Sequence, residues 1–294
     1  MRLDVVMPTW NSNTPYFKIV LKRIVESIPI NKFILIDRYS TDGTVDQVKA
    51  IIPSDKLIII ETNADLARAR AIGIRHVNTE FFVFVDSDIL IPRNFGIEKW
   101  LRLLVANKKL AVISFPIRSI YNYIKYATSP TQYTRVSRVL RRYEEIADWE
   151  IVKYGLFRLT AGDLFLAILQ TDVVKDWWPS PHLSALEVLS LTQHILTNGY
   201  LWIEVATPVI HLKELKYGTG VYRYLKQGLW TGSNARILNI SKKHFFLETF
   251  SRLLLGTAKK ILAKDPIGAL RNVFFRMGYL IGYLSPRKYR VWIR

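Results

Sequence analysis

Five runs of apolar residues recur along the first 115 residues of the chain, and the segments between them have the spacing of amphipathic helices. The runs are LDVVM (3–7), KFILI (32–36), KLIII (56–60), FFVFV (81–85) and LAVISF (110–115). Their apolar character is continuous rather than alternating, which is typical of strands that are covered on both faces. The pattern therefore predicts an α/β protein in which helices join the strands of a mostly parallel sheet.

Polar residues mark where the intervening helices begin. Thr14, Thr44 and Asp65 are the expected caps of three helices. The first helix ends before Pro29, and the third covers about residues 65–77. Helices and strands therefore alternate regularly over this part of the chain.

Beyond residue 115 the alternation is looser. The sequence predicts a short apolar run after Gly162 and a helix over about residues 184–197. An apolar strand is expected over residues 201–210, ending at His211. This part of the chain is therefore expected to continue the α/β pattern with fewer helices.

Two amphipathic helices are expected near the end of the chain. The segment FFLETFSRLLLG (245–256) has apolar residues at helical spacing, and Asp265 with Pro266 begins a second helix. The apolar stripe of the second helix consists of Ile267, Leu270, Phe274, Met277 and Ile281. Each helix either packs on the body of the protein or lies at a membrane surface. The basic residues around the stripes and in the final segment PRKYRVWIR favour the membrane.

Asp86 and Asp88 directly follow the fourth apolar run. Side chains two residues apart in an extended chain project the same way, so the two carboxylates repel each other unless a cation is near. Ligands of parallel sheets bind beyond the carboxyl ends of the strands, where PTWNS, DRYSTDG and ETNAD also lie. Because divalent cations take carboxylate oxygens and share their coordination with phosphate, the sequence predicts a metal that holds a nucleotide diphosphate.

The composition is that of a globular protein. The 294 residues are 50% hydrophobic and 22% charged, which excludes disordered and collagen-like classes. The absence of cysteine excludes disulfides and thiolate zinc sites. No apolar run reaches the roughly 18 residues that cross a bilayer, and the opening MRLDVVMPTW lacks the apolar region of a signal peptide. We therefore expect a cytoplasmic protein.

The charge is concentrated near the end of the chain. The net charge is +18, and residues 201–294 contain 17 Lys and Arg against 4 Asp and Glu. A basic segment of this kind implies an anionic partner such as lipid headgroups, phosphates or nucleic acid. No zinc-finger, RNA-recognition or helix-turn-helix pattern is present in the sequence, so an anionic membrane surface is the expected partner and nucleic acid is not.

The motifs resemble, in their order along the chain, those of the family 2 glycosyltransferases, which are inverting enzymes with the GT-A fold. The first strand and nucleotide-contacting loop of that family resemble VVMPTWN (5–11). Its strand ending in Asp-Asp-Gly-Ser-Thr-Asp-Gly-Thr is similar to ILIDRYSTDGT (34–44), and its Ala-Arg-Asn-x-Gly-Ile segment is similar to LARARAIGI (66–74). The metal motif of the family matches VDSD (85–88). The resemblance implies a GT-A catalytic domain followed here by amphipathic helices.

The resemblance also implies roles for individual residues. Asp37 would recognise the base, Arg70 would lie near the donor phosphates, and Asp88 would hold Mn²⁺ or Mg²⁺. The further candidates for the metal are Asp86 and His211. The residues expected to bind the nucleotide sugar are Pro8, Thr9, Asn11, Asp37, Arg70, Asp86 and Ser87.

The catalytic base is less clearly marked. The segment ALEVLSLTQHILTNGY (185–200) resembles the family helix that carries Glu-Asp and ends in Gly-Tyr. The Glu of that pattern is Glu187, but Val188 stands where the family often has the catalytic Asp. We therefore expect Glu187 to act as the base for a hydroxyl acceptor, whereas a lipid phosphate acceptor needs no base.

Three further positions depart from the family pattern. Arg38 and Tyr39 replace Asp and Gly, and Ala71 replaces the usual Asn. There is also some similarity to the polyprenyl-phosphate sugar synthases, but Leu90 stands where that branch has Gln. Arg38, Ala71 and Val188 support an alternative function, namely a catalytically degenerate relative that binds membrane or nucleic acid through its basic C-terminal third.

The expected function is metal-dependent transfer of a sugar from a UDP or GDP donor to a polyprenyl-linked or saccharide acceptor. The protein would act as a peripheral protein on the inner face of the cell membrane. Residues 1–115 would form the donor-binding half of the GT-A domain, and residues 116–240 the acceptor-binding half with the metal and base region. Residues 241–294 would form a basic amphipathic helical tail.

Overall fold

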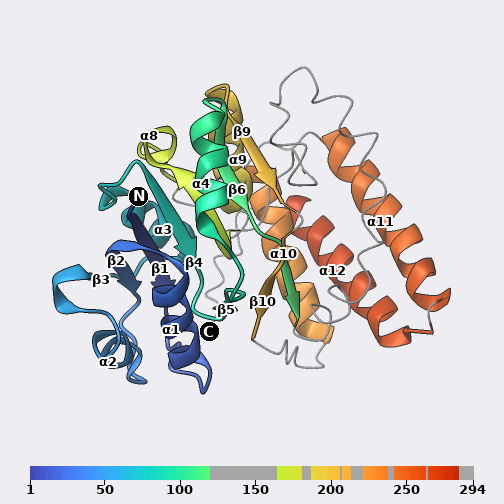
Figure 1. The fold of residues 1–294 in the computed structure, drawn as a ribbon. Helices are drawn as coiled ribbons and strands as arrows, with labels where there is room; N and C mark the ends of the chain where they lie inside the picture. Colours follow the sequence, from blue (N-terminus) through green and yellow to red (C-terminus); the bar gives the residue numbers. More distant parts are fainter. Residues whose placement is uncertain are drawn as a thin grey trace. The chain divides into compact units, whose positions relative to one another are not determined.

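The computed structural model describes residues 1–119, 164–180, 187–205, 207–212, 221–237, 242–262 and 264–284 (Figure 1). The chain divides into two compact units. The first consists of Met1–Trp178 and Leu191–Glu214, and the second of Pro179–Ser190 and Leu215–Arg294. The predicted division at residues 115 and 240 concerns donor and acceptor binding and stays a prediction. Residues 120–163 and 213–220, and the end of the chain from residue 285 with its segment PRKYRVWIR, lie outside the described residues.

The first unit contains a seven-stranded sheet with the strand order β3-β2-β1-β4-β8-β6-β9. Neighbouring strands are parallel except around β8, which runs antiparallel to β4 and to β6. The strands are β1 (Leu3–Thr9), β2 (Ile30–Asp37), β3 (Leu57–Glu61), β4 (Phe81–Val85), β6 (Leu110–Ser114), β8 (Leu166–Gln170) and β9 (Leu201–Glu204). All five predicted strands are present, and the predicted α/β fold with a mostly parallel sheet is confirmed.

A second, three-stranded sheet has the order β5-β10-β7 and consists of β5 (Ile89–Leu90), β10 (Val209–His211) and β7 (Ile117–Ser119). The prediction of one strand over residues 201–210 was wrong, because β9 and β10 belong to different sheets. Pro208 stands directly before β10 and has no N–H to donate, so it interrupts a continuous ladder.

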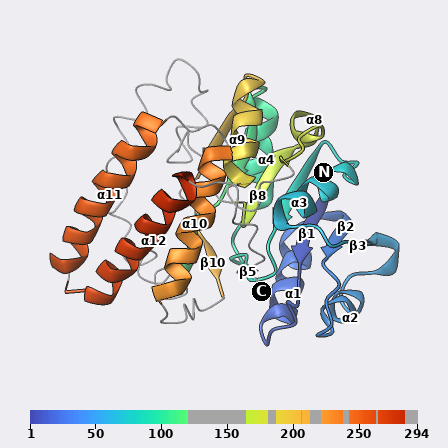
Figure 2. The ribbon, with the colours of Figure 1, turned by 180° about the vertical axis from the view of Figure 1, so that it is seen from behind.

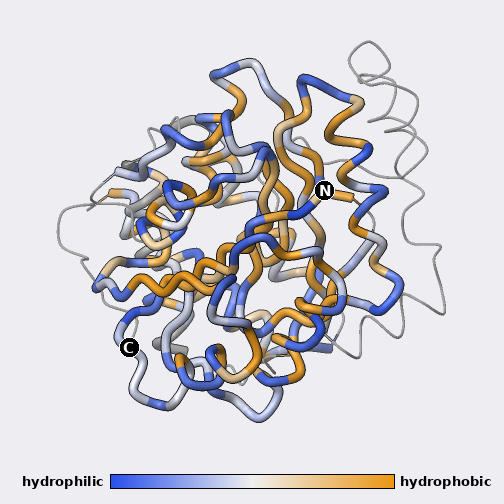
Figure 3. The backbone as a smooth tube through the Cα atoms, turned by 60° about the vertical axis from the view of Figure 1, so that its left-hand side comes forward, coloured by the Kyte–Doolittle hydropathy of each residue, from blue (hydrophilic) through white to orange (hydrophobic). Residues whose placement is uncertain are grey.

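Helices cover both faces of the large sheet. The helices of this part of the chain are α1 (Phe17–Ser27), α2 (Thr44–Lys49), α3 (Leu66–Arg75), α4 (Ile97–Ala106), α8 (Thr171–Val174) and α9 (Glu187–Thr197), with a 3₁₀ turn at Ser54–Lys56. Residues of α1 and α4 form one core with Leu3, Val5 and Met7, whereas Gly73 of α3 lies against Val6, which points to the other face (Figures 1 and 2). β1 and β4 are buried along their whole length, because neither face of the sheet meets water at these two strands; Figure 3 colours the backbone by hydropathy.

Only one of the three predicted caps has the expected form. The side chain of Asp65 accepts a hydrogen bond from the Arg68 N–H of α3 at 2.9 Å, which confirms this cap. Thr14 lies in a turn before α1, and the residue that precedes this helix is Tyr16. Thr44 is the first residue of α2, where its hydroxyl donates to Asp42 at 2.5 Å.

Asp4 fixes the amino end of the sheet. Its carboxylate is fully buried and accepts hydrogen bonds from four N–H groups at 2.7–3.2 Å. Three come from the backbone of Lys32, Asn78 and Thr79, and the fourth comes from the Asn31 side chain. A buried carboxylate is tolerated when such donors satisfy it, so Asp4 ties β2 and the loop before β4 to β1.

The second unit contains three long helices, α10 (Val221–Ile237), α11 (Lys242–Leu262) and α12 (Pro266–Leu284), of which α12 packs against both others. The helices predicted near residues 245–256 and from Pro266 are confirmed, and the Asp265 side chain caps α12 through the Gly268 N–H at 2.7 Å. Helix α10 was not predicted from the sequence. None of the helices within the described residues combines the length and the hydropathy that a membrane crossing requires.

Candidate active site

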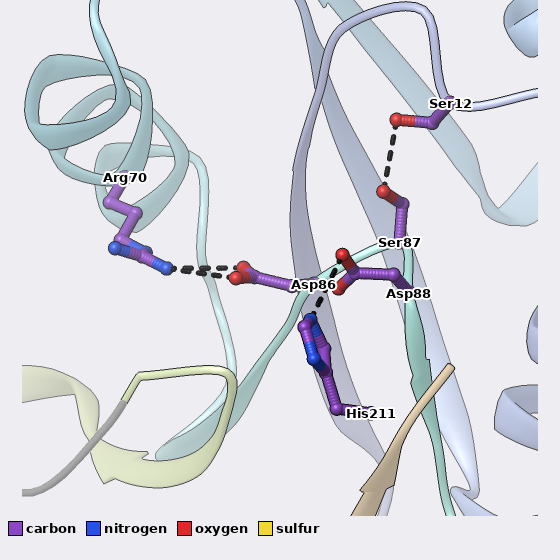
Figure 4. Close-up of polar contacts among 6 residues, drawn as sticks. All are labelled: Ser12, Arg70, Asp86, Ser87, Asp88 and His211. Atoms are coloured by element: carbon purple, nitrogen blue, oxygen red, sulfur yellow. Dashed lines mark hydrogen bonds and ion pairs between the residues drawn. The ribbon is translucent and has the colours of Figure 1, made fainter. Parts of the chain in front are cut away.

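The predicted metal motif lies in a turn that connects the two sheets. The chain leaves β4 at Val85 and turns at residues 86–88 before it enters β5. The Ile89 N–H donates to the carbonyl oxygen of Asp86 at 3.2 Å, which closes the turn. In the view of Figure 4 the carboxylates of Asp86 and Asp88 point in the same direction, but each has its own cationic or polar partner.

Asp86 forms an ion pair with Arg70 of α3. The Arg70 Nη2 lies 3.1 Å and 3.4 Å from the two carboxylate oxygens (Figure 4). The Arg70 side chain is only 3% exposed and that of Asp86 is 18% exposed, so the pair is largely shielded from water. Gly73 allows this arrangement, because a Cβ at that position would overlap the Val6 side chain of β1 and push α3 away. The Arg70 guanidinium therefore neutralises the charge of Asp86, one of the two neighbouring carboxylates for which the sequence indicated no cation.

Asp88 lies beside His211, at the end of β10. The Asp88 Oδ2 and the His211 Nε2 are 3.3 Å apart, and the side chains are 20% and 11% exposed (Figure 4). Strand pairing fixes this contact, since His211 is in register with Ile89 and the Leu212 N–H donates to the Asp88 carbonyl at 2.9 Å. The structure thus brings together two of the three predicted metal ligands, Asp88 and His211.

The pair fits a divalent cation. Two ligand atoms that are neighbours around a metal at about 2.1 Å lie about 3 Å apart, which is close to the observed separation. Among the described residues no group of three Asp, Glu, His or Cys side chains could hold a metal. Among the described residues, one carboxylate and one imidazole thus lie together, and phosphate oxygens of a ligand would complete the coordination. Asp86 is paired with Arg70, and its role as a metal ligand stays a prediction.

A chain of hydroxyl groups joins the metal motif to the loop after β1. Ser87 and Thr9 both donate to the Ser12 hydroxyl, at 2.9 Å and 2.7 Å. Pro8 is buried beside them in β1 and is in register with Ile36 of β2. Pro8, Thr9 and Ser87 therefore lie at the same edge of the sheet as Asp86 and Asp88, as predicted.

The loops after β1 and β2 are bound to each other. Asn11 accepts from the Thr41 N–H at 2.9 Å and donates its own N–H to the Ser40 hydroxyl at 2.8 Å. The Asp42 carboxylate accepts from the N–H of Asn13 and from the hydroxyl and N–H of Thr44. Burial alone would raise the pKa of Asp42, but these hydrogen bonds outweigh it and lower the pKa below its ordinary value. The two loops therefore form one ordered rim at the carboxyl edge of the sheet.

Asp37 lies inside this rim and is not exposed at its surface. It is fully buried, and its two oxygens accept from the N–H and the hydroxyl of Ser40 at 2.7 Å and 2.6 Å. The expected contact of Asp37 with a nucleobase stays a prediction. Trp10 and Tyr39 were not among the predicted site residues. They are 42% and 57% exposed on the same loops. Ser40 and Asp42 were also missed, although the Asp-x-x-Ser and Thr-Asp-Gly-Thr patterns are typical of side chains that cap turns.

Glu187, the predicted base, is the first residue of α9 in the described part of the chain. It belongs to the second unit, whereas Asp86, Asp88 and His211 belong to the first. Its role as a base stays a prediction. The later residue His194 of the same helix contacts the Val173 carbonyl and Asp176, each at 3.1 Å, away from the metal motif.

The sequence comparison identifies the class of this protein. A model described as "Glycosyl transferase family 2" matches residues 4–155, more than half of the chain, so the chain belongs to glycosyl transferase family 2. The predicted family is thus confirmed. An uncharacterized glycosyltransferase from Haemophilus influenzae is 32% identical over 108 residues, which cover 36% of this chain and 43% of that protein. The match therefore spans less than half of the relative's own length.

Solved structures confirm the GT-A fold. The mannosyltransferase PcManGT from Pyrobaculum calidifontis, in complex with GDP-Man and Mn²⁺, is similar with a TM-score of 0.64 and 18% identity over 98% of this chain and 88% of that chain. TarS 1-349 from S. aureus in complex with UDP has a TM-score of 0.52 and 14% identity over 100% and 94% of the two chains. Glucosyl-3-phosphoglycerate synthase from Mycobacterium tuberculosis, in complex with Mg²⁺ and UDP, has a TM-score of 0.51 and 13% identity over 81% and 78%.

Proposed function

We propose that this protein transfers a hexose from a UDP or GDP sugar, with inversion at the anomeric carbon, to a lipid-linked or saccharide acceptor. The proposal rests chiefly on the Asp88–His211 pair, which lies beside the Asp86–Arg70 pair at the carboxyl edge of the sheet in a family 2 chain. The similar structures hold GDP-Man with Mn²⁺ or UDP with Mg²⁺, which supports a nucleotide donor and a divalent metal.

Asp88 and His211 would hold the Mn²⁺ or Mg²⁺ ion. When bound, the metal would neutralise charge on the departing diphosphate. Arg70 fixes the Asp86 carboxylate by the ion pair, so that Asp86 is held as an acceptor for hydroxyl groups of the nucleotide sugar. The Asp86 carboxylate would lose little conformational entropy when the nucleotide sugar binds, because Arg70 has already restricted its motion.

Glu187 is the proposed base for a hydroxyl acceptor. The acceptor oxygen would form the new bond to the anomeric carbon while the bond to the diphosphate breaks, and the hydroxyl proton would pass to the Glu187 carboxylate. A phosphate acceptor is already ionised and needs no such transfer. Glu187→Gln would therefore lower the rate at least about a hundredfold with a hydroxyl acceptor and leave it unchanged with a phosphate acceptor.

The exposed aromatic side chains of the rim are the proposed contacts of the nucleobase. The Arg38 guanidinium lies 5.1 Å from the ring centre of Trp10, and Tyr39 is held at a φ of 50° in the same loop. Since Asp37 is buried and bonded to Ser40, stacking on Trp10 or Tyr39 gives the base an available partner. Such stacking accepts either uracil or guanine.

A thermal-shift screen tests the donor site. UDP, GDP and their sugar conjugates are added with and without Mn²⁺ to the wild type, to Asp88→Ala and to Asp55→Asn, an exposed carboxylate at the opposite edge of the sheet. We expect a metal-dependent rise in Tm with one nucleotide, its loss in Asp88→Ala and its retention in Asp55→Asn. An undiminished rise in Asp88→Ala would disprove the metal assignment. No rise in Tm with any nucleotide would instead support the alternative of a catalytically degenerate relative.

A further inference from the structure

The second unit exposes many large apolar side chains on two neighbouring helices. On α11 the most exposed are Leu254, Leu255 and Leu262, at 68%, 71% and 84%. The others on α11 and α12 are Leu247, Phe250, Ile261, Ile267, Leu270, Met277, Ile281 and Leu284. Apolar side chains that gather on one surface in this way mark an interaction site more often than scattered ones do.

Helix α11 is apolar on two opposite faces. Its inner face packs on α12, with the Phe245 ring stacked 3.6 Å from the Tyr283 ring and Thr249 buried. Its outer face carries Leu247, Phe250 and Leu254 at the spacing of successive helical turns. The inner face already satisfies the packing of the helix, and the described residues of the unit do not account for the outer face.

Helix α12 repeats this arrangement. Gly278, Tyr279, Gly282 and Tyr283 are buried against the neighbouring helices. The stripe predicted from the sequence is on the other side, and its members Ile267, Leu270, Met277 and Ile281 are 41–58% exposed. Within the described residues of the second unit, these four side chains therefore contribute little to the packing of α12.

The basic side chains of α11 indicate the chemistry of its partner. Arg252, Lys259 and Lys260 are exposed on α11, and residues 215–294 contain 16 Lys and Arg against 2 acidic residues. A second copy of this positively charged surface would repel it, and nucleic acid would leave the exposed leucines uncovered. Anionic lipid headgroups over an apolar interior complement both features at once.

We propose that the exposed face of α11 lies in the headgroup region of an anionic membrane, with the helix in the plane of its surface. The exposed leucines of α11 enter the boundary of the acyl chains, and its basic side chains contact the headgroups. This inference goes beyond sugar transfer and does not depend on it. If both hold, the surface brings the active site to lipid-linked acceptors.

Vesicle flotation tests the apolar contribution. The wild type is expected to float with vesicles of phosphatidylcholine and phosphatidylglycerol. The triple variant Leu254→Gln/Leu255→Gln/Leu262→Gln should bind at least about tenfold more weakly. The matched control is Ile19→Gln/Val25→Gln/Val105→Gln, which removes three exposed apolar side chains from the first unit and should float as the wild type does. Equal flotation of the two triple variants would overturn the proposal.

A second set of variants tests the charges. Arg252→Gln, Lys259→Gln and Lys260→Gln should each weaken binding to anionic vesicles about fivefold, the equivalent of about 1 kcal/mol per charge near a membrane. Vesicles of phosphatidylcholine alone should bind the wild type far more weakly than anionic ones. Equal binding to both kinds of vesicle would exclude a role for the headgroup charge.

Insertion can be followed directly, because the chain has no cysteine of its own. An environment-sensitive fluorophore on Leu254→Cys or Leu255→Cys should shift to shorter wavelength when anionic vesicles are added, and one on Ile19→Cys should not. A duplex oligonucleotide that shifts the label at residue 254 while vesicles do not would overturn the proposal in favour of nucleic acid. Asp88→Ala should float like the wild type, so loss of donor binding and loss of membrane binding are distinguishable.

Discussion

Asp88 and His211 are separated by 123 positions in the sequence, yet the carboxylate oxygen of one lies 3.3 Å from the imidazole nitrogen of the other. The contact is determined by the backbone, because β10 pairs with the two-residue strand that directly follows Asp88. Both side chains are therefore held before any ligand binds. A preformed pair of this kind lowers the entropic cost of taking up a metal.

His211→Ala should weaken Mn²⁺ binding at least about tenfold in the presence of the nucleotide, because the site loses one of its two protein ligands. Calorimetric titration of Mn²⁺ at a fixed, saturating nucleotide concentration measures this. His194→Ala is the matched control, since His194 contacts Val173 and Asp176 rather than the metal motif. Equal Mn²⁺ affinity in the two variants would remove His211 from the site.

Arg70→Met should destabilise the protein by about 3–5 kcal/mol, because it leaves the Asp86 carboxylate shielded from water without its cation. The double variant Arg70→Met/Asp86→Asn should lose markedly less than the sum of the single variants. Urea unfolding of the four proteins gives this coupling energy. Additive losses would mean that the two side chains act independently and that Arg70 does not position Asp86.

The strands and the acidic turn of the site were predictable from the sequence because they depend on local pattern. FFVFV needed only continuous apolar character to be placed in the sheet, and Asp86 and Asp88 needed only their place at its end. Asp65 could be predicted as a cap for the same reason, since its partner is three residues away. Features of this kind depend on neighbouring residues and not on contacts with distant parts of the chain.

The features that were missed depend on distant contacts. The bond between Asp37 and Ser40 is the exception, because the two residues are three positions apart and the Asp-x-x-Ser pattern already indicates it. The break between β9 and β10 depends on their pairing with strands about 90 residues earlier. Helix α10 was missed because Gly228 and Gly232 weaken its helical pattern, although both are required by the close approach of α12.

Asp42→Ala should cost about 1 kcal/mol at pH 7, because the rim loses the acceptor for Asn13 and Thr44. Those hydrogen bonds lower the folded-state pKa of Asp42 below the ordinary value of 3.8. The stabilisation is therefore complete above pH 3.8 and is lost as the pH falls through the lower, folded-state pKa. Urea unfolding of wild type and variant between pH 7 and pH 3 should show their difference shrinking only at the acid end. Asp55→Ala controls for general acid effects, and an identical profile in that variant would contradict the assignment.

Gly278→Ala tests the contact between α10 and α12. A Cβ at Gly278 would overlap the backbone carbonyl oxygen of Leu225, which cannot move aside as a side chain can. The helices would have to separate, at a typical cost of about 1–3 kcal/mol that exceeds the gain of up to about 1 kcal/mol in helix propensity. Gly256→Ala is the matched control, because its Cβ would meet only the side chain of Asn272 at 3.3 Å. Thermal unfolding should therefore show a lower Tm for Gly278→Ala than for Gly256→Ala. The reverse order would mean that the two helices do not approach as closely as described.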